Sequence, residues 1–370
     1  MTDAYIDISR YAPQISVQVA GKSFEQLSDV LELRVTLQKD ELSGFSMLVA
    51  NELDLESQQF RYSDASVLDV FEPVEIQMGY AGPGGMATMF VGEITALQPS
   101  FPSSGLPTIN VTGTDMLGRL RRAKPGAEIK KSFDGPDWQI ASEIAQRHGL
   151  TLSGSSSRTG PVHKGVMQRD MDDLQFLLYL AKRNNFEAAI VIEHGEAKLY
   201  FGKPREWRRE GKAPVRLAWG QSLVSFTPRL SVGGQVSKVT VRGWNARTKE
   251  KIEYTAELKD LPRTGKGAAG AELLERKAGA KDERIVDRVV QSQEEAKQLA
   301  IELLSETANQ FLTGNGEAMG DPAIRPLAQI ELGGLGPRYN GKYDVTKTDH
   351  VFGASGYMTT FEVERMREGA

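Results

Sequence analysis

A short stretch near the C-terminus, RYNGKYDVTKTDHVFGASGYMTTFEVER (residues 338–365), carries several residues able to do acid–base or metal chemistry. It holds His350, one of four histidines in the chain, with the carboxylates Asp344, Asp349, Glu362 and Glu364. A histidine near carboxylates can act as a general base or bind a metal ion. Polar and apolar residues also alternate here, which is typical of paired strands. The first question is therefore whether this stretch is a reactive site or a hairpin that contains a histidine.

The remaining histidines give little support for a metal site. His148 is expected in the last turn of a helix, His163 in a loop and His194 in a hairpin turn. No two histidines have the i, i+2 or i, i+4 spacing of paired ligands, so a site would need distant residues to converge. The chain has no cysteine, which excludes thiolate catalysis, disulfides and cysteine-ligated zinc.

Other motifs favour structural interpretations. Asp172 and Asp173 fall in the first turn of a predicted helix, where negative charge is favoured in any case. The RTGKGAAG segment, 263–270, lacks the first glycine of a phosphate loop, and Gly267 stands where Ser or Thr would hold magnesium. The basic stretch Lys203–Glu210 around Trp207 is interpreted as a solvated edge. A glycosidase-type carboxylate pair stays possible among 49 acidic residues, although none is marked out. We predict no catalytic, cofactor-binding or metal-binding residue.

Composition restricts the class of protein. With 370 residues, the chain should form two to four domains. A net charge of −4 with interspersed signs argues against a dedicated nucleic-acid binder. The N-terminus lacks the pattern of a signal peptide, and no window approaches the roughly 18 apolar residues of a membrane span. We therefore expect synthesis in the cytoplasm without an export signal and no membrane span.

The elements that would position these residues fall into three regions. The first, 1–120, alternates with period two and predicts a small β-barrel. The second, 121–211, contains helices near 134–150 and 169–188, followed by two strands, and predicts a small α+β domain. The third, 212–370, returns to strands and predicts a second barrel. Its insertion at about 262–325 begins with a polar segment, Pro262–Arg284, expected to be mobile, and continues with a helix capped by Ser292.

A weak repeat connects the first and third regions. The order PVEIQMG, FVGEIT and PTINVTG in the first region is matched by PLAQIELG, YNGKYDV and MTTFEVER in the last. Each series has a Pro before a strand, then an aromatic-x-Gly motif, then a Thr-containing alternating strand. Gly inside a strand is typical of a bulge or a barrel corner. From these residues alone, a genuine duplication and a chance match between two β domains are equally plausible.

The order of these segments resembles the phage late-control gene D family, the baseplate hub proteins of contractile tails. These proteins are related to the hub region of the valine-glycine-repeat spike proteins of type VI secretion. The resemblance covers nearly the whole chain. Its most specific part is the spacing of Gly320-Asp321-Pro322, Arg325-Pro326, Gly341-x-Tyr343, His350 and Gly356-Tyr357-x-Thr359. Leu327 departs from the family, which commonly has Gly at that position.

The resemblance implies an α+β, mostly β fold. Two similar antiparallel β-barrel domains would flank a small α+β domain, with a helix-containing insertion in the second barrel. His350 would begin or precede a closing strand and form hydrogen bonds at a turn. The family implies a non-enzymatic homotrimer with six quasi-equivalent units, which joins a hexameric inner-tube protein to a separate trimeric spike protein among other baseplate proteins. It would belong to a phage tail or an extracellular contractile injection particle, without cofactors or specific nucleic acid.

Two other functions stay open at this stage. A tail-associated cell-wall hydrolase would need paired catalytic groups in a cleft, and no segment of the sequence marks such a pair. A DNA-passage channel of a phage tail would need a net-basic lumen. The sequence does not distinguish a phage tail from an injection particle that delivers protein.

Overall fold

The structure is a computed structural model. It describes most of the chain, namely residues 12–39, 41–55, 58–63, 67–82, 85–121, 132–160, 162–184, 186–203, 213–245, 248–261, 267–279, 283–287, 290 and 292–369. The strand content is high and most pairings are antiparallel, so the predicted mostly β class is confirmed.

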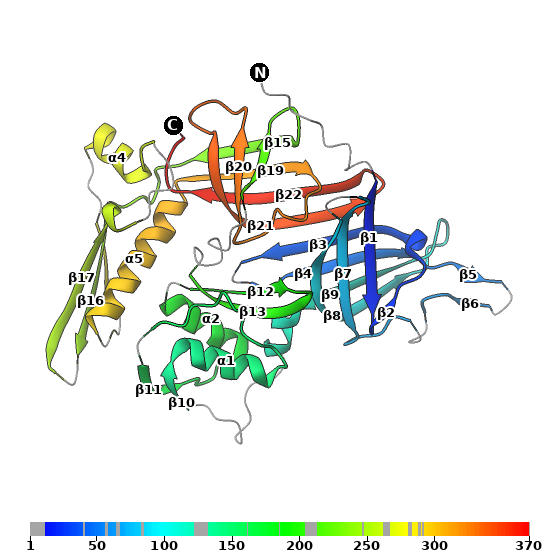
Figure 1. Cartoon of the computed structure of the whole chain (residues 1–370), viewed down its shortest axis with the longest axis horizontal. Coiled ribbons are helices and arrows are strands. Elements are labelled where there is room, and N and C mark those ends of the chain that lie inside the picture. The colour runs from blue at the N-terminus through cyan, green and yellow to red at the C-terminus, as the bar shows by residue number, and fades with distance from the viewer. Residues whose placement is uncertain are drawn as a thin grey trace.

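One large sheet of 13 strands runs through both ends of the described chain (Figure 1). Its main path is β15 (Leu223–Leu230), β19 (Leu312–Met319), β22 (Gly356–Arg365), β21 (Gly341–Gly353), β3 (Val30–Gln38), β4 (Gly44–Ala50), β9 (Thr108–Asp115), β8 (Met86–Ser100), β7 (Pro73–Tyr80), β1 (Pro13–Val19) and β2 (Lys22–Ser23). The branch consists of β20 (Gln329–Gly333), which pairs with β21, and β14 (Val215–Ala218), which pairs with β20.

The two separate barrels expected from sequence are not found. Within the described residues no closed barrel is formed, because β21 of the C-terminal region pairs with β3 of the N-terminal region and joins both into one open sheet. The junction runs from Lys347 opposite Gln38 to Phe352 opposite Leu33. This pairing satisfies backbone groups that a two-barrel arrangement would have to pair within each barrel.

The two halves of the sheet repeat one strand order. The N-terminal half reads β7-β8-β9-β4-β3, and the C-terminal half reads β20-β21-β22-β19-β15. In both halves the chain visits these positions in the same sequence, starting with β3 or β15. The long central strands β8 and β21 each carry a bulge, at Thr95 and Thr346. The weak sequence repeat therefore coincides with a repeat in topology.

One face of the sheet is buried and the other is open. A single row of cross-strand partners on the buried face runs Leu223, Ala318, Thr359, His350, Val35, Phe45, Gly113 and Ile94. Every member of this row is buried. Because side chains alternate between faces, the next row lies on the open face, and from β15 to β9 it is Ser225, Glu317, Thr360, Asp349, Thr36, Gly44 and Thr114.

The buried face carries two hydrophobic cores. The first is built around Leu33, Phe45, Met47, Ile76 and Ile94 of the N-terminal half. The second is built around Leu223, Phe311, Ile330, Tyr343 and Phe361 of the C-terminal half. Each half-sheet is therefore stabilised by its own core, although the backbone ladder is continuous.

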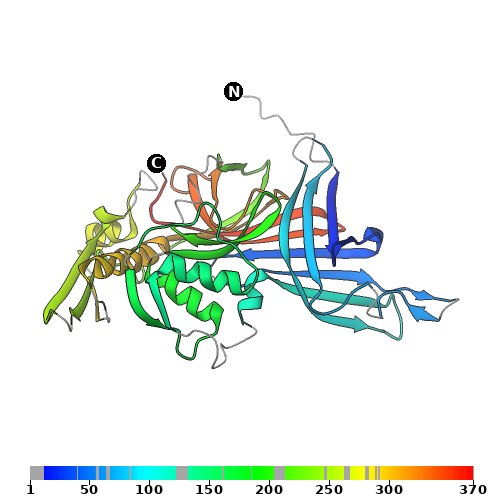
Figure 2. The ribbon, with the colours of Figure 1, turned by 60° about the horizontal axis from the view of Figure 1, so that its bottom comes forward.

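A small α+β unit lies against the sheet (Figure 2). It comprises the short 3₁₀-helix η3 (Met116–Arg121), β10 (Ser132–Pro136), α1 (Asp137–Arg147), β11 (Val162–Met167), α2 (Asp173–Arg183), β12 (Glu187–Glu193) and β13 (Glu196–Gly202). Ile140, Ile144, Leu177 and Leu180 point from the two helices into a shared core. The apolar spacing in the sequence predicted both helices.

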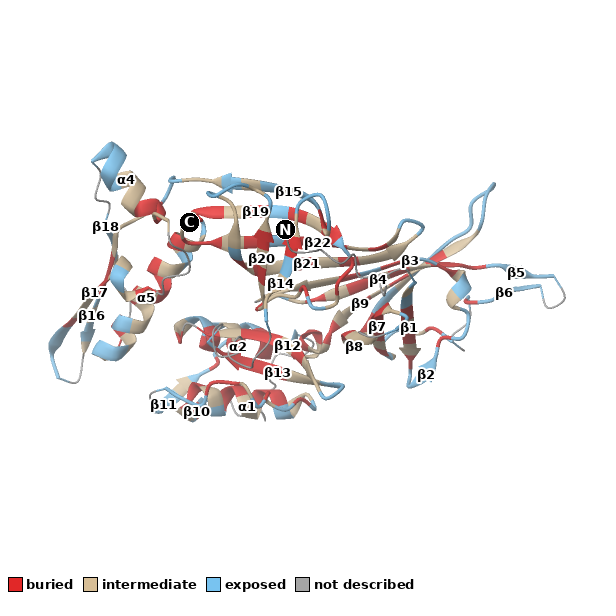
Figure 3. Ribbon diagram, turned by 45° about the horizontal axis from the view of Figure 1, so that its top comes forward, coloured by how far each residue is buried: buried red, intermediate tan, exposed pale blue. Residues whose placement is uncertain are grey.

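A third unit combines the expected insertion with the two strands that precede it. It contains β16 (Lys238–Asn245), β17 (Glu250–Glu257), α4 (Gly270–Ala278), β18 (Glu283–Asp287) and α5 (Gln293–Asn309). The described part of Pro262–Arg284, the segment expected to be mobile, contains regular structure, because α4 begins where Ala269 and Ala271 are buried and β18 pairs in parallel with β16. The outer part of α4 is exposed, as is the hairpin of β5 (Leu53–Asp54) and β6 (Gln59–Phe60) (Figure 3).

Candidate assembly surface

His350 lies inside strand β21, three residues before its end, and its side chain has no exposed surface. Its Nε2 is 2.9 Å from the Ile324 carbonyl oxygen, which can only accept, so Nε2 carries the proton. Nδ1 accepts from the Tyr357 hydroxyl at 2.8 Å and is 3.1 Å from Thr359 Oγ1. The expected hydrogen-bonding role is confirmed, and the expected position before a strand or in a turn is wrong.

Burial also removes His350 from acid–base chemistry near neutral pH. It lowers the pKa of the imidazole to about 3, since the charged form would lose its hydration, and the positive charge of Arg325 acts in the same direction. The ring is therefore neutral at pH 7 and has no access to a substrate. His350 is a structural residue of the sheet.

The family-like motif residues meet around this histidine. Gly320 approaches the ring of Tyr357 so closely that a Cβ at this position would overlap the ring carbons. The backbone N–H of Asp321 donates to Thr359 Oγ1 at 3.1 Å, and the Asp321 carboxylate accepts from the N–H of Ala323 at 2.9 Å. The spacing noticed in the sequence thus describes one loop, 320–327, packed onto β21 and β22.

Arg325 ties this loop to the other half of the sheet. Its guanidinium donates to the carbonyl oxygen of Thr88 on β8 at 2.8 Å and to that of Pro322 at 2.7 Å. Tyr80 on β7 donates its hydroxyl proton to the carbonyl oxygen of Gly320 at 3.0 Å. Burial lowers the pKa of Arg325, yet the group stays charged at neutral pH. These contacts fasten the C-terminal loop to the N-terminal half-sheet.

Leu327, the departure from the family pattern, occupies a backbone position that favours glycine. Its φ is 69°, in the left-handed region. Its side chain is buried with Ala189, Val191 and Tyr200 of β12 and β13. Burial of the leucine against the α+β unit therefore offsets the strain of the left-handed conformation.

The other candidate residues are also structural. His148 follows α1, and its Nε2 is 2.7 Å from Asp173 Oδ2. His163 lies on β11 rather than in the predicted loop, and His194 lies in the expected turn between β12 and β13. Asp172 caps α2 through the N–H of Gln175 at 2.7 Å. Residues 204–210 of the basic stretch and 263–266 of the glycine-rich segment lie outside the described residues.

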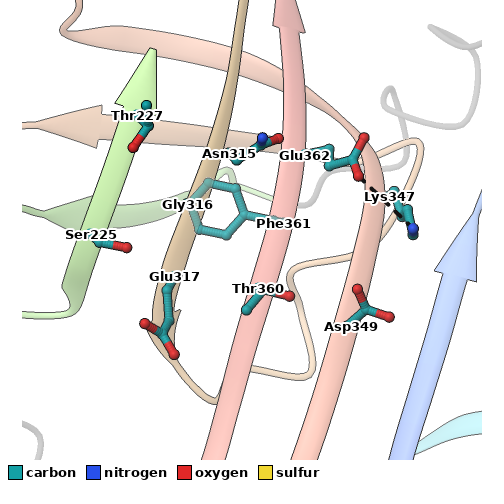
Figure 4. Close-up of a pocket in the computed structure, with 10 residues that line it drawn as sticks. All are labelled: Ser225, Thr227, Asn315, Gly316, Glu317, Lys347, Asp349, Thr360, Phe361 and Glu362. Carbon is teal, nitrogen blue, oxygen red and sulfur yellow. Dashed lines mark ion pairs between the residues drawn. The ribbon is translucent and has the colours of Figure 1, made fainter.

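The surface that stands out is the open face of the sheet, which is polar across both halves. In the C-terminal half it forms a hollow of about 410 Å³ between β15, β19, β22 and β21 (Figure 4). Three carboxylates, Glu317, Asp349 and Glu362, line it together with one cation, Lys347. Lys347 Nζ lies 3.9 Å from Glu362 Oε1. Hydroxyl and amide side chains, such as Thr227 and Asn315, complete the lining.

Strands β8 and β15 each leave an edge of this sheet unpaired within the described residues, as do β2 at the other end of the path and β14 on the branch. β15 has β19 as its one strand neighbour, and its first residue, Leu223, also forms an isolated bridge with Trp219. β8 pairs with β7 up to Glu93, and its second half, Thr95–Ser100, pairs only with β9. An unpaired edge exposes a row of N–H and C=O groups that can pair with another chain. Pro228 on β15 and Pro99 on β8 are placed as prolines on edge strands usually are.

The sequence did not reveal these edges, because local alternation does not say which strand is outermost. It also did not mark Phe101 and Trp219, apolar side chains that stay 54% and 62% exposed beside the edges of β8 and β15. Among the described residues, no group of three or more His, Asp or Glu side chains is arranged to hold a metal ion. No helix of the described part is long and apolar enough to cross a membrane.

Comparison with known proteins agrees with this architecture. Residues 10–353 match the family model described as the Alg8 N-terminal domain. The chain is similar to the 43 kDa tail protein of prophage MuSo2 from Shewanella oneidensis (13% identity, TM-score 0.69, covering 96% of this chain and 98% of that one). It is also similar to a tail protein from Neisseria meningitidis (11%, TM-score 0.65, 96% and 97%).

A third similar structure is the E. coli c3393 protein, a component of the type VI secretion system (12% identity, TM-score 0.59, covering 96% of this chain and 78% of that one). A comparison with curated proteins gave no match. At these identities the likeness concerns the fold. The resemblance to a baseplate hub of the gene D type is confirmed at that level.

Proposed function

The chain belongs to the Alg8 N-terminal domain family, and from that premise we propose that it is a structural baseplate hub of a contractile tail or injection particle. Three copies would form a ring that joins a hexameric inner tube to a trimeric spike. The observation that carries this proposal is the repeated strand order within one open sheet.

The repeat gives each chain two similar units, as an adaptor between threefold and sixfold symmetry requires. Each chain contributes two half-sheets of four strands along the open face, β15-β19-β22-β21 and β3-β4-β9-β8. Three chains then present six similar half-sheets while keeping threefold symmetry. A ring of this kind can contact a six-subunit tube on one side and a three-subunit spike on the other.

The internal junction provides a template for the joint between copies. Inside one chain, the second half of β21 pairs with β3. The equivalent strands are β8 and β15, and within the described residues both keep a free edge on the side where the junction forms. Along the eight-strand path successive neighbours are antiparallel, so β15 of one copy would continue the antiparallel pattern after β8 of the next.

The stagger of the strands has the size that a barrel requires. Bulges at Leu31 on β3 and Val224 on β15 align the two halves, which makes Leu33 equivalent to Phe226. The row of partners from Phe226, however, reaches β3 at Leu37. Leu37 lies four residues beyond Leu33, and the path from β15 to β3 crosses four strand pairs, so the stagger is one residue per strand. One residue per strand is the ratio of an eight-stranded barrel of shear 8, whose strands tilt by about 36°. Three copies would close 3 × 8 strands in the same way.

The open polar face supports a channel inside this ring. The opposite face is already covered by the two cores of the chain, and the open face is hollowed at Glu317 and Asp349. Its lining, three carboxylates to one lysine, is not the net-basic surface that a DNA-passage channel would need. No observation favours the cell-wall hydrolase. We therefore assign the chain a structural, non-enzymatic role without cofactors.

We propose the domain division 1–120, 121–211 and 212–370, with the insertion at about 262–325. Separate hydrophobic cores support it, including one that the insertion shares with the strands before it, around Val239, Val241, Leu304 and Ala308. The proposed partners are two further copies of the chain, a separate trimeric spike protein, a hexameric inner-tube protein and other baseplate proteins. The protein would be made in the cytoplasm and become part of a phage tail or an extracellular injection particle.

Mass photometry of the purified chain, alone and with the spike and tube proteins of its genome, tests the proposal. A trimer of 40.7-kDa chains has a mass of about 122 kDa (3 × 40.7). Electron microscopy of that species should show a threefold ring with six similar units around a channel. A chain that stays monomeric at every concentration and with both partners would refute the proposal.

A further inference from the structure

Two apolar groups of side chains lie exposed beside the free edges of β8 and β15. Next to the end of β8, Phe101 is 54% exposed and contacts Phe60 of the β5–β6 hairpin, with ring centroids 4.7 Å apart and the ring planes tilted by 55°. Next to the start of β15, Trp219 is 62% exposed and Val224 is 51% exposed. Exposed aromatic side chains next to an unpaired strand edge form an interaction surface and promote aggregation if nothing covers them.

The internal junction indicates what covers Phe101. The bulges at Thr95 and Thr346 align β8 with β21, so Phe101 is equivalent to Phe352, because both lie six residues beyond their bulge. Phe352 stands opposite Leu33 across the junction and packs against the first core. Phe101 has the same place in the repeat but meets no β3 equivalent within its own chain.

The same alignment identifies the residue of a second copy that would face Phe101. Leu33 lies two residues beyond the bulge at Leu31, and Phe226 lies two residues beyond the bulge at Val224. Phe226 therefore occupies the position across from Phe101 when β15 of a second copy pairs with β8. Phe226 is partly buried against the second core, in edge-to-face contact with Tyr343 at 5.6 Å.

We propose that Phe101 of one copy packs against Phe226, Val224 and Trp219 of the next copy and so seals one rim of each joint in the ring. This inference rests on the proposed trimeric hub, and it adds the register of the joint. In this register Ser100 lies opposite Thr227, as Val351 lies opposite Arg34 in the internal junction. Phe60 is in contact with Phe101, so the β5–β6 hairpin would also lie against the neighbouring copy.

A second copy of this chain is the occupant that the observations favour. The two surfaces lie on opposite edges of one sheet, so neither can cover the other within the chain. Both lie at the same end of the strands, where β8 ends and β15 begins. A head-to-tail joint brings them together once per copy, and a closed ring leaves neither exposed.

Cysteine cross-linking tests the register directly, because the natural chain has no cysteine. The double variant Ser100→Cys/Thr227→Cys should give covalent dimers and trimers under mild oxidation, since directly opposed residues have Cβ atoms roughly 4.5–5.5 Å apart. Each single variant should not give trimers. The matched control Ser100→Cys/Val232→Cys places the second thiol on an exposed residue beyond the other end of β15 and should not form the ladder.

Mass photometry of Phe101→Ala tests the seal. The variant should raise the concentration at which trimers dissociate by about tenfold or more, as truncation of a buried interface aromatic does. Leu106→Ala, which removes another exposed apolar side chain after β8, is the control. It should change the concentration at which trimers dissociate by less than about threefold. Circular dichroism would show that both variants fold.

The outcomes separate the two proposals. A cross-linked trimer together with weakened Phe101→Ala trimers supports the joint. Wild-type trimers without the cross-link, and with Phe101→Ala as stable as wild type, overturn the joint and leave the hub proposal in place. A wild-type chain that never forms trimers, alone or with spike and tube proteins, overturns both.

Discussion

Replacing His350 by Gln should change how the stability of the protein depends on pH. The imidazole is fully buried, and its pKa in the folded state is about 3, against an ordinary value of 6.5. Between these two values the unfolded chain binds a proton that the folded chain does not. The stabilisation from the neutral ring is therefore complete above pH 6.5 and is lost progressively as pH falls toward 3.

The size of the effect follows from the pH interval between the folded and unfolded pKa values of His350. Each pH unit within this window costs about 1.4 kcal/mol, so acidification from pH 6.5 to pH 4.5 should remove about 3 kcal/mol from the free energy of unfolding. Gln at position 350 keeps one donor and one acceptor for Ile324 and Tyr357 and does not titrate. His350→Gln should therefore be less stable than wild type at pH 7, and this deficit should shrink by about 3 kcal/mol at pH 4.5.

Urea unfolding at both pH values measures this difference. His194→Gln, the same replacement at a histidine exposed in a turn, is the control. NMR of the imidazole Cε1–H resonances gives an independent measurement, in which His350 should not titrate above about pH 4. A constant deficit for His350→Gln across this range, or a midpoint near 6.5 for its resonance, would refute the reasoning.

Three other substitutions test the same region by urea or thermal unfolding. Burial raises the pKa of the Asp115 carboxyl to about 7, against 3.8 in the unfolded chain. The stabilisation that the protonated carboxyl gives to the folded state is therefore complete below pH 3.8 and is lost as pH rises through 7. Asp115→Asn lacks this stabilisation and should lose more stability than wild type on acidification. Gly320→Ala should cost about 2 kcal/mol or more, because the new Cβ overlaps the Tyr357 ring that holds His350, and unchanged stability would contradict this packing. Leu327→Gly should relieve about 1 kcal/mol of strain and lose about 3 kcal/mol of burial, a net loss of about 2 kcal/mol, whereas a gain would show that strain dominates.

Much of the local structure could be read from the sequence. Period-two alternation predicted the strands, and apolar residues at helical spacing predicted α1, α2 and α5. Both patterns arise from the geometry of a single segment, so they need no knowledge of its neighbours. The spacing of Gly320, Arg325, His350 and Tyr357 carried the resemblance to the gene D family, and the structure brings these residues together where the loop 320–327 packs on β21 and β22.

What the sequence could not decide is which strands meet. Pairing of β21 with β3 joins residues such as Asp349 and Thr36, which are 313 positions apart, and it turned two expected barrels into one open sheet. The burial of His350 and the exposure of Phe101 have the same origin, because one strand has a neighbour on that edge and its equivalent does not. Alternation identifies the two faces of a strand, whereas the partner along each edge depends on how the whole chain folds and, for β8 and β15, on the neighbouring copies we propose.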